Sequence, residues 1–358
     1  EPEKKMGWKA SDTRQLFFNN MVIDQSSMIA TPGEGFKIFL KILTGGRISI
    51  AALAVGTAQG AYDRALKYST ERIAFGKEIN KFQSIGFKLS DMATQIEAAK
   101  LLTFHAAWKK DNGQDIIKEA AMAKLFASEA AMKITTDAIQ IHGGMGYAAE
   151  LGLEMAYRDS RITKIYEGTN DINGMLSVAE LIKKGLKTKE LDLNGAGKKI
   201  PFMVLSEHFR WGKSGRWKRE QRLIKGIKNT FLLILGAAGK KLKQDLIKEQ
   251  EIILNLASIL AEAYMAESVY LKVRKLASAN QNITDLSVQE KIAQLYLYKS
   301  LNKVQNEAKE AIDSFASGFE KRILNYFADK LLPPYLQNPK ALSREITDHA
   351  LMQRKYPF

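Results

Sequence analysis

Apolar residues recur at helical spacing along most of this chain, and this periodicity limits what the chain can fold into. Within residues 85–103 they stand three or four positions apart, which predicts one apolar helix face. The helices expected before residue 190 span residues 47–71, 85–110, 115–140 and 167–189. Four long helices joined by short, glycine-bearing links are typical of a helical bundle.

The second half of the chain predicts a separate helical domain. Residues 190–248 are strongly basic and interrupted by glycine, so we expect a basic linker there. Beyond it, apolar faces return over residues 252–273 and 288–302, and another helix is expected over residues 306–329. The expected domains are 31–189, a helical bundle; 190–248, the basic linker; and 249–358, an appended helical domain.

The first thirty residues have a different pattern. Residues 14–24 suggest strand, turn and strand, with Asn19 and Asn20 at the turn. Two strands alone do not make a stable sheet. We therefore expect residues 1–30 to be the end of a β domain that begins before this chain, and no signal peptide is predicted because no apolar stretch follows the first residues.

Composition excludes several kinds of chemistry. The chain has no cysteine, which rules out disulfides, thiolate catalysis and iron–sulfur clusters. Its four histidines are scattered without metal-ligand spacing, so no metal site is expected. The net charge of +15 calls for an anionic partner or a strongly basic surface. The apolar run 231–238 is too short to cross a bilayer.

A single carboxylate, Glu167, lies on a predicted turn immediately before a helix. Gly168 permits a tight turn, and Thr169, Asn170 and Asp171 are typical N-cap residues. The free N–H groups at such a helix start suit a phosphate or another anion. The turn can therefore present a base beside an anion-binding surface. The alternative is that Glu167 only complements the helix dipole and its neighbours only cap the helix.

A glycine-rich run, 143–146, follows the expected helix 115–140. Because it follows a helix and not a strand, the dinucleotide-binding fingerprint does not apply. The run is a helix stop, or else a loop in which the backbone approaches a cofactor closely.

Taken together, several motifs resemble one family. They are Arg72-Ile-Ala-Phe-Gly76 with Gln83, Gln140-Ile-His-Gly-Gly-Met-Gly-Tyr147, Tyr157-Arg158-Asp159, and Tyr166-Glu-Gly-Thr-Asn-Asp171. In this order and spacing they resemble the C-terminal helical domain of the acyl-CoA dehydrogenases. The region beyond residue 185 resembles the very-long-chain members, which carry an additional C-terminal helical domain. The expected fold is mainly α: the family's four-helix bundle, a second helical domain, and a remnant of the β domain.

The resemblance implies an FAD site and a catalytic base. Glu167 matches the base that removes an α-proton from an acyl thioester while a hydride leaves the β-carbon for the flavin. Arg72 is expected to pair with the FAD pyrophosphate across a dimer interface. The other residues that the resemblance assigns to FAD are Gln83, Gln140, Ile141, His142, Gly143, Gly144, Thr169, Asn170 and Asp171.

Substrate and partners are implied in the same way. Arg47 matches an arginine near the acyl-CoA site, and Tyr166 and Gly168 are expected beside the substrate. Thr44 stands where short-chain members have an acidic residue. The implied function is α,β-dehydrogenation of a medium-to-long acyl-CoA in fatty acid β-oxidation. The implied partners are an electron-transferring flavoprotein and a second copy in a homodimer.

Two alternatives for the function stay open. An acyl-CoA oxidase would use the same base but pass the electrons of the flavin to oxygen. A non-catalytic membrane or assembly module would bind no flavin and show no turnover. Tryptophans among basic residues in 198–235 favour contact with anionic lipid or a solvated linker, and no nucleic-acid recognition module accompanies them. A bacterial cytoplasmic location, at the inner face of the membrane where the basic segment docks, is the expectation.

Overall fold

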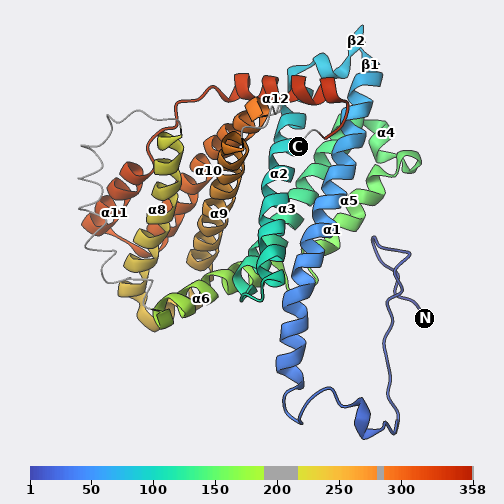
Figure 1. Ribbon diagram of the computed structural model, residues 1–358, viewed down its shortest axis with the longest axis vertical. Coiled ribbons are helices and arrows are strands. Elements are labelled where there is room, and N and C mark those ends of the chain that lie inside the picture. The colour runs from blue at the N-terminus through green and yellow to red at the C-terminus, as the bar shows by residue number, and fades with distance from the viewer. Residues whose placement is uncertain (189–216, 280–285, 357–358) are drawn as a thin grey trace.

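The chain folds into two helical units that pack side by side, as Figure 1 shows for the computed structural model. The structure describes residues 1–188, 217–279 and 286–356. The first unit contains the long helices α1 (Gly35–Glu71), α2 (Gln83–Asp111), α3 (Ile117–His142) and α6 (Asn170–Thr188). Helix α3 packs against each of the other three. The mainly helical fold class is confirmed.

Alanine explains the close packing of this first unit. Helix α3 buries ten apolar residues along its length, most of them alanine, and α1 presents alanines to it at helical spacing. Alanine has the highest helix propensity and its small side chain lets two helix backbones approach closely. The stripe expected on α2 is buried: Leu89, Met92 and Ile96 are each fully inaccessible to solvent.

Short elements connect the long helices. After α1 the chain makes a hairpin, β1 (Ile73–Ala74) and β2 (Lys77–Glu78), in which Ile73 pairs with Glu78. Phe75 and Gly76 form its tip with φ values of +51° and +78°. The other short elements are η1 (Gln25–Ser27), η2 (Ile79–Lys81), α4 (Gly144–Tyr147), η3 (Ala149–Leu151) and α5 (Leu153–Thr163).

Several expected boundaries in the first unit were wrong. Helix α1 begins at Gly35 and runs through Gly45 and Gly46, which we had placed before the helix. A helical segment over α5 was not expected at all, because its eleven residues are too short for a clear periodic pattern. Gly143 does end α3, with φ +61° at the C-cap, as expected for a helix stop.

The second unit contains α8 (Lys218–Leu242), η4 (Lys243–Lys248), α9 (Gln250–Ser278), α10 (Leu286–Phe315), α11 (Gly318–Leu331) and α12 (Pro339–Gln353). Helices α8, α9 and α10 pack on one another. Helices α10 and α11 differ from the expected 288–302 and 306–329 segments. One continuous helix spans 286–315, and the break comes at residues 316 and 317, before Gly318, whose φ is +57°. Helix α12 was not predicted.

The expectation of a basic linker over residues 190–248 is wrong for the second part of that range. Helix α8 buries Leu223, Ile227, Phe231 and Leu235 at spacings of four, so its apolar face belongs to the core of the second unit. Its basic residues are on the other face. The apolar run we had assigned to a membrane surface is therefore used for packing. The first part of that linker, up to residue 216, lies outside the described residues.

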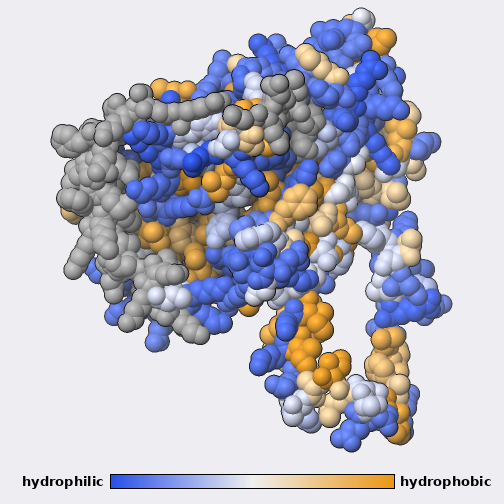
Figure 2. Space-filling model, in the orientation of Figure 1, coloured by the Kyte–Doolittle hydropathy of each residue, from blue (hydrophilic) through white to orange (hydrophobic). Residues whose placement is uncertain are grey.

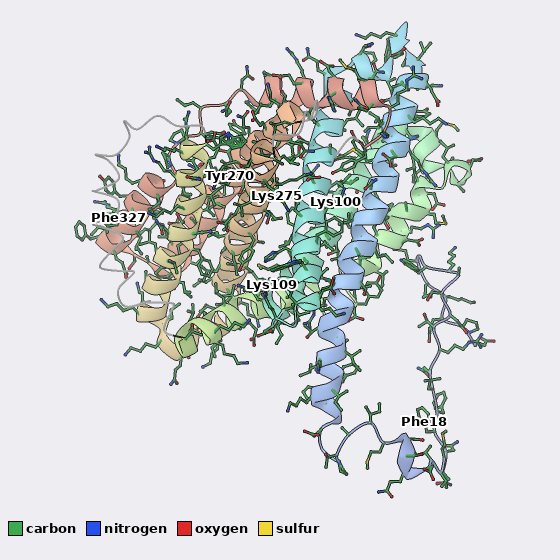
Figure 3. All side chains as sticks on the ribbon, viewed as in Figure 1. Phe18, Lys100, Lys109, Tyr270, Lys275 and Phe327 are labelled. Carbon is green, nitrogen blue, oxygen red and sulfur yellow. The ribbon has the colours of Figure 1, made fainter. Side chains whose placement is uncertain are left out.

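The N-terminal segment also differs from its expectation. Within the described residues, 14–24 contain no strand, because no backbone ladder forms between their two halves. Residues 14–24 lie away from the bundle, as Figure 3 shows for the stretch that carries Phe18, and Phe17 and Phe18 are 81% and 73% exposed. Figure 2 shows that this apolar surface continues onto the first turns of α1, where Phe36 and Phe39 are exposed.

By length and composition alone, α1 and α9 are each apolar enough to cross a bilayer. Most of the apolar part of α9 is buried inside the protein, which is the usual reason that a core helix passes such a test.

Candidate active site

The turn between α5 and α6 carries the predicted base. Helix α5 ends at Thr163, α6 begins at Asn170, and between them Glu167 and Gly168 have φ values of +55° and +84°. Two consecutive residues in the left-handed region reverse the chain within a few residues. This conformation costs a non-glycine residue roughly 1–2 kcal/mol. Such strain at Glu167 persists only because the surroundings hold it in place.

Three side chains hold the carbonyl groups of this turn. Asn173 Nδ2 donates to the Gly168 and Thr169 carbonyls at 2.7 and 3.1 Å. Lys124 Nζ on α3 donates to the Gly168 carbonyl at 2.7 Å, and Arg47 Nε on α1 donates to the Glu167 carbonyl at 3.2 Å. Every carbonyl from 167 to 169 is therefore occupied, and the direction of the Glu167 side chain follows from these contacts.

Asn170 links the turn to α3. Its Oδ1 accepts from Lys124 at 3.0 Å and from Ser128 at 3.1 Å, and its Nδ2 donates to Glu129 Oε1 at 2.7 Å. The side chain is buried. Asn170, which the resemblance assigns to FAD, thus has its amide fully engaged inside the protein. The neighbouring Thr169 and Asp171 are exposed.

The Glu167 carboxylate lies directly against α1. A Cβ placed on Gly46 would meet Glu167 Oε2 at 2.7 Å and Oε1 at 2.9 Å, so only glycine leaves room for the acid there. Oε2 is buried and has no hydrogen-bond partner among the described residues. A carboxylate that only capped α6 would accept N–H bonds. A buried oxygen with a free lone pair suits a proton acceptor instead.

Positive charges surround this acid. Burial lowers the pKa of the Arg47 guanidinium, and the Glu167 carboxylate opposes that change. Burial also lowers the pKa of Lys124 to about 8, with the Arg47 charge adding to the effect. The pKa of Tyr166 is raised by burial and then by the Glu167 charge. The buried cations Arg47 and Lys124 therefore interact electrostatically with the Glu167 carboxylate.

The remaining predicted FAD residues lie at the opposite end of the bundle. Arg72, Gln83 and Gln140 are exposed there, and their side chains have no hydrogen-bond or ion-pair partner within the described part of the chain. Gly143 has open space where a Cβ would stand. A guanidinium and free amides beside an open glycine fit the pyrophosphate and polar groups of FAD. The residues present at this end therefore suit that cofactor.

Two of the predicted residues at that end are internal. Ile141 and His142 are buried, and the His142 ring stacks on Tyr68 with centroids 4.2 Å apart. His142 Nδ1 donates to the Ala138 carbonyl at 2.8 Å. Both residues thus position the glycine loop that follows them.

The comparisons with known proteins give a family for both helical units. Residues 33–182 match the family described as acyl-CoA dehydrogenase, C-terminal domain, and residues 226–328 match a second family of the same description. Both helical units of this chain are acyl-CoA dehydrogenase C-terminal domains. The short-chain specific mitochondrial acyl-CoA dehydrogenase of Bos taurus is 51% identical over 181 residues, which are 51% of this chain and 44% of that protein. The chain therefore spans about half the length of the curated relatives it matches.

Solved acyl-CoA dehydrogenases share the architecture. An acyl-CoA dehydrogenase from Bacillus anthracis, complexed with FAD, aligns with 100% of this chain and 64% of its own, at a TM-score of 0.94 and 27% identity. Butyryl-CoA dehydrogenase from Megasphaera elsdenii aligns with 51% of this chain and 48% of its own, at a TM-score of 0.50 and 46% identity. These relatives give no support to the very-long-chain part of our expectation.

In this acyl-CoA dehydrogenase bundle, the acid lies far from the exposed residues that the resemblance assigns to FAD. Gly46, which contacts Glu167, and Glu71, which precedes Arg72, are separated by 25 residues of α1, roughly 38 Å at 1.5 Å per residue. The structure brings together Arg47, Tyr166, Glu167 and Gly168 at one end, and Arg72, Gln83 and residues 140–144 at the other.

Sequence reasoning missed the part that Gly46, Lys124, Ser128 and Asn173 play in this candidate site. A lysine within the alanine-rich run 120–131 was an available signal, since a charged residue on a helix face that is otherwise apolar needs a buried partner. No cluster of three metal-ligating side chains occurs in the ranges that the structure describes.

Proposed function

We propose that this chain is the C-terminal part of an FAD-dependent acyl-CoA dehydrogenase that converts an acyl-CoA thioester to its trans-2-enoyl product. The observation that carries the proposal is the buried Glu167 carboxylate oxygen without a hydrogen-bond partner, held on a strained turn. The family match and the FAD complex of the Bacillus anthracis enzyme support the cofactor.

In this proposal Glu167 removes the α-proton of the acyl group. Its carboxylate accepts the proton as the α C–H bond breaks, and bound FAD supplies the hydride acceptor for the β-carbon. Arg47 and Lys124 hold the turn through its carbonyl groups, so the carboxylate does not have to reorganise during proton transfer. The backbone N–H of Glu167 is available to polarise the thioester carbonyl.

The wider assembly also belongs to the proposal. One copy places the acid about 38 Å from the exposed FAD residues, so each flavin would need residues from two copies, which favours a homodimer. Reduced flavin would pass its electrons to an electron-transferring flavoprotein.

The base is tested by Glu167→Gln in the FAD-loaded enzyme. Glutamine keeps the shape of the side chain but cannot accept the proton, so dehydrogenation should fall by about 10³-fold or more. Flavin should stay bound, with an unchanged visible spectrum. The matched control is Glu251→Gln, an exposed acid of the second unit, which should keep full activity. If Glu167→Gln retains turnover, Glu167 is not the base.

The medium-to-long acyl chain stays part of this proposal. Two features support it: the second helical domain, and Thr44, which stands where short-chain members have an acidic residue. The identity of this chain to short-chain enzymes argues against it. A kcat/KM series from butyryl-CoA to palmitoyl-CoA decides the matter. We expect the longer substrates to be preferred, and a maximum at butyryl-CoA overturns this part.

A further inference from the structure

Helix α12 of the second unit lies across the start of α2 in the first unit (Figure 1). Thr347 Oγ1 donates to the Gly86 carbonyl at 2.6 Å, and this bond is buried. The start of α12 is fixed too, because Asn338 Oδ1 accepts from the Lys340 and Ala341 N–H groups and Pro339 occupies the first helical position. The second unit is therefore held firmly against the end of the bundle that carries Gln83.

A cavity of about 220 Å³ lies between these two elements. Residues of both units line it, among them Asn80, Lys81, Gln83 and Phe87 on one side and Arg344 and Asp348 of α12 on the other. Arg344 belongs to none of the family motifs and has no role in the proposed reaction. The cavity is composite, since neither unit alone encloses it.

The charges in the cavity are incompletely balanced. Lys81 and Arg344 have no ion-pair partner within the described residues, and Asp348 is the one carboxylate among the lining residues. Asn80 is only 9% exposed; its Nδ2 donates to Glu78, but its Oδ1 is buried and has no partner there. A buried amide oxygen that lacks a donor indicates a missing ligand or water.

These groups match the chemistry of an adenosine diphosphate. A guanidinium and an ammonium suit phosphate oxygens, with arginine able to bind two of them at once. Asparagine and glutamine amides suit the polar edge of adenine. Phe87 offers an aromatic surface, and Asp348 can accept a hydrogen bond from an amine or a ribose hydroxyl.

We propose that this cavity binds the adenosine diphosphate end of FAD and that Arg344, from the second helical unit, is a cofactor-binding residue. The inference rests on the proposed function, in which Gln83 contacts FAD. Coenzyme A carries the same chemical group. We favour FAD because Arg72 is the arginine expected to bind the FAD pyrophosphate, and its backbone lies next to the segment that lines the cavity. The Arg72 carbonyl accepts a hydrogen bond from the Ile79 N–H at 2.9 Å. The appended unit thereby completes the cofactor site.

The test compares Arg344→Ala with Lys340→Ala in the enzyme freed of flavin. Both changes remove one exposed positive charge from α12, but Lys340 does not line the cavity. Flavin fluorescence quenching gives the dissociation constants of FAD and FMN, and calorimetry gives that of coenzyme A. Arg344→Ala should weaken FAD about tenfold, and FMN, which lacks the adenosine, should bind as before. Lys340→Ala should bind both normally.

Other outcomes overturn the proposal. Unchanged FAD affinity in Arg344→Ala removes Arg344 from the cofactor site, and a loss confined to coenzyme A assigns the cavity to the substrate. An equal loss of affinity for FAD and FMN shows a general structural effect. In that case the flavin-free variant should also have a lowered midpoint of thermal unfolding. Wild-type protein that binds no FAD refutes the proposed function itself, which is a different result from a loss specific to Arg344.

Discussion

Gly46 decides where the Glu167 carboxylate can lie. The atoms that a Cβ would meet there are the carboxylate oxygens, at the far end of a flexible side chain. Gly46→Ala should therefore push the acid out of position without unfolding the helix, and alanine should even stabilise α1 by about 1 kcal/mol. We expect kcat to fall by about 10²-fold while the urea midpoint holds or rises, because small displacements of a catalytic group are costly.

Gly56→Ala and Gly60→Ala on the same helix are the matched controls. No atom lies within 4 Å of a Cβ at either position, so both should stabilise α1 and leave kcat unchanged. If Gly46→Ala behaves as these two do, the carboxylate does not act from the position described.

Lys124 gives a prediction about pH. Its folded pKa of about 8 lies below the ordinary value of 10.5, so the charged form costs folding free energy. That cost is full below pH 8 and disappears as pH rises from 8 to 10.5, since the folded state loses the proton first. The stability difference between wild type and Lys124→Met, which cannot titrate, should therefore shift in favour of wild type between pH 7 and 9.5 in urea denaturation.

Lys133→Met serves as the comparison for this measurement. Lys133 is on the same helix and pairs with Asp137 at the surface. Its stability difference from wild type should stay nearly constant over the same pH range. A flat response for Lys124→Met as well means that the lysine is not buried as the structure places it.

The site could be predicted only where its residues are local in sequence. Residues 164–171 contain the turn glycine, the cap residues and the acid, and that cluster was identified correctly as a turn before a helix. Lys124 and Gly46 stand more than forty residues from Glu167 in the chain. Their roles depend on how α1 and α3 pack, which periodicity does not determine. The functional assignments of the site residues stay predictions.

At the scale of elements, α8 shows where composition misleads. Its eleven buried residues include four of the five in the apolar run 231–235, yet its many lysines and arginines had suggested a linker. A basic exposed face and an apolar buried face are compatible in one amphipathic helix. Helices α2, α3 and α9 were predicted well because their periodic patterns are long, whereas α5, α11 and α12, of 11 to 15 residues, were missed or misplaced.

Gly226 tests whether α8 belongs to the core. A Cβ there would lie 2.0 Å from the carbonyl oxygen of Leu331 at the end of α11, and backbone cannot move aside cheaply. Gly226→Ala should destabilise the protein by about 1–3 kcal/mol in thermal or urea unfolding. Gly239→Ala, on the same helix with no atom within 4 Å of its Cβ, should stabilise it instead. Equal effects at both positions contradict the packing of α8 on α11.

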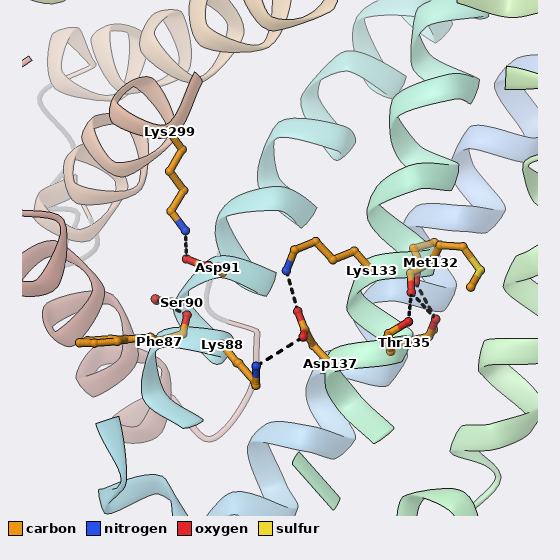
Figure 4. Close-up of polar contacts among 11 residues, drawn as sticks. Phe87, Lys88, Ser90, Asp91, Met132, Lys133, Thr135, Asp137 and Lys299 are labelled. Carbon is orange, nitrogen blue, oxygen red and sulfur yellow. Dashed lines mark hydrogen bonds and ion pairs between the residues drawn. The ribbon is translucent and has the colours of Figure 1, made fainter. Parts of the chain in front are cut away.

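At the scale of the whole molecule, polar contacts join the two units. Lys299 of α10 pairs with Asp91 of α2, as Figure 4 shows. Glu97 of α2, 1% exposed, accepts from Lys272 of α9 and from the Tyr356 hydroxyl at 3.1 Å. The Tyr356 N–H also donates to Asp63 of α1 at 3.0 Å. The residues after α12 therefore bind back onto the first unit, which holds the two walls of the composite cavity together.

The distance between the two ends of α1 leads to a prediction about the homodimer. If each flavin is served by Glu167 of one copy and Arg72 of another, a mixed dimer of Glu167→Gln and Arg72→Ala chains contains one intact site and one doubly altered site. Each variant alone should be inactive, yet the mixed dimer, isolated with two different affinity tags, should turn over at about half the wild-type rate per dimer. Sites confined to single chains predict no recovery, because every site would then carry one substitution.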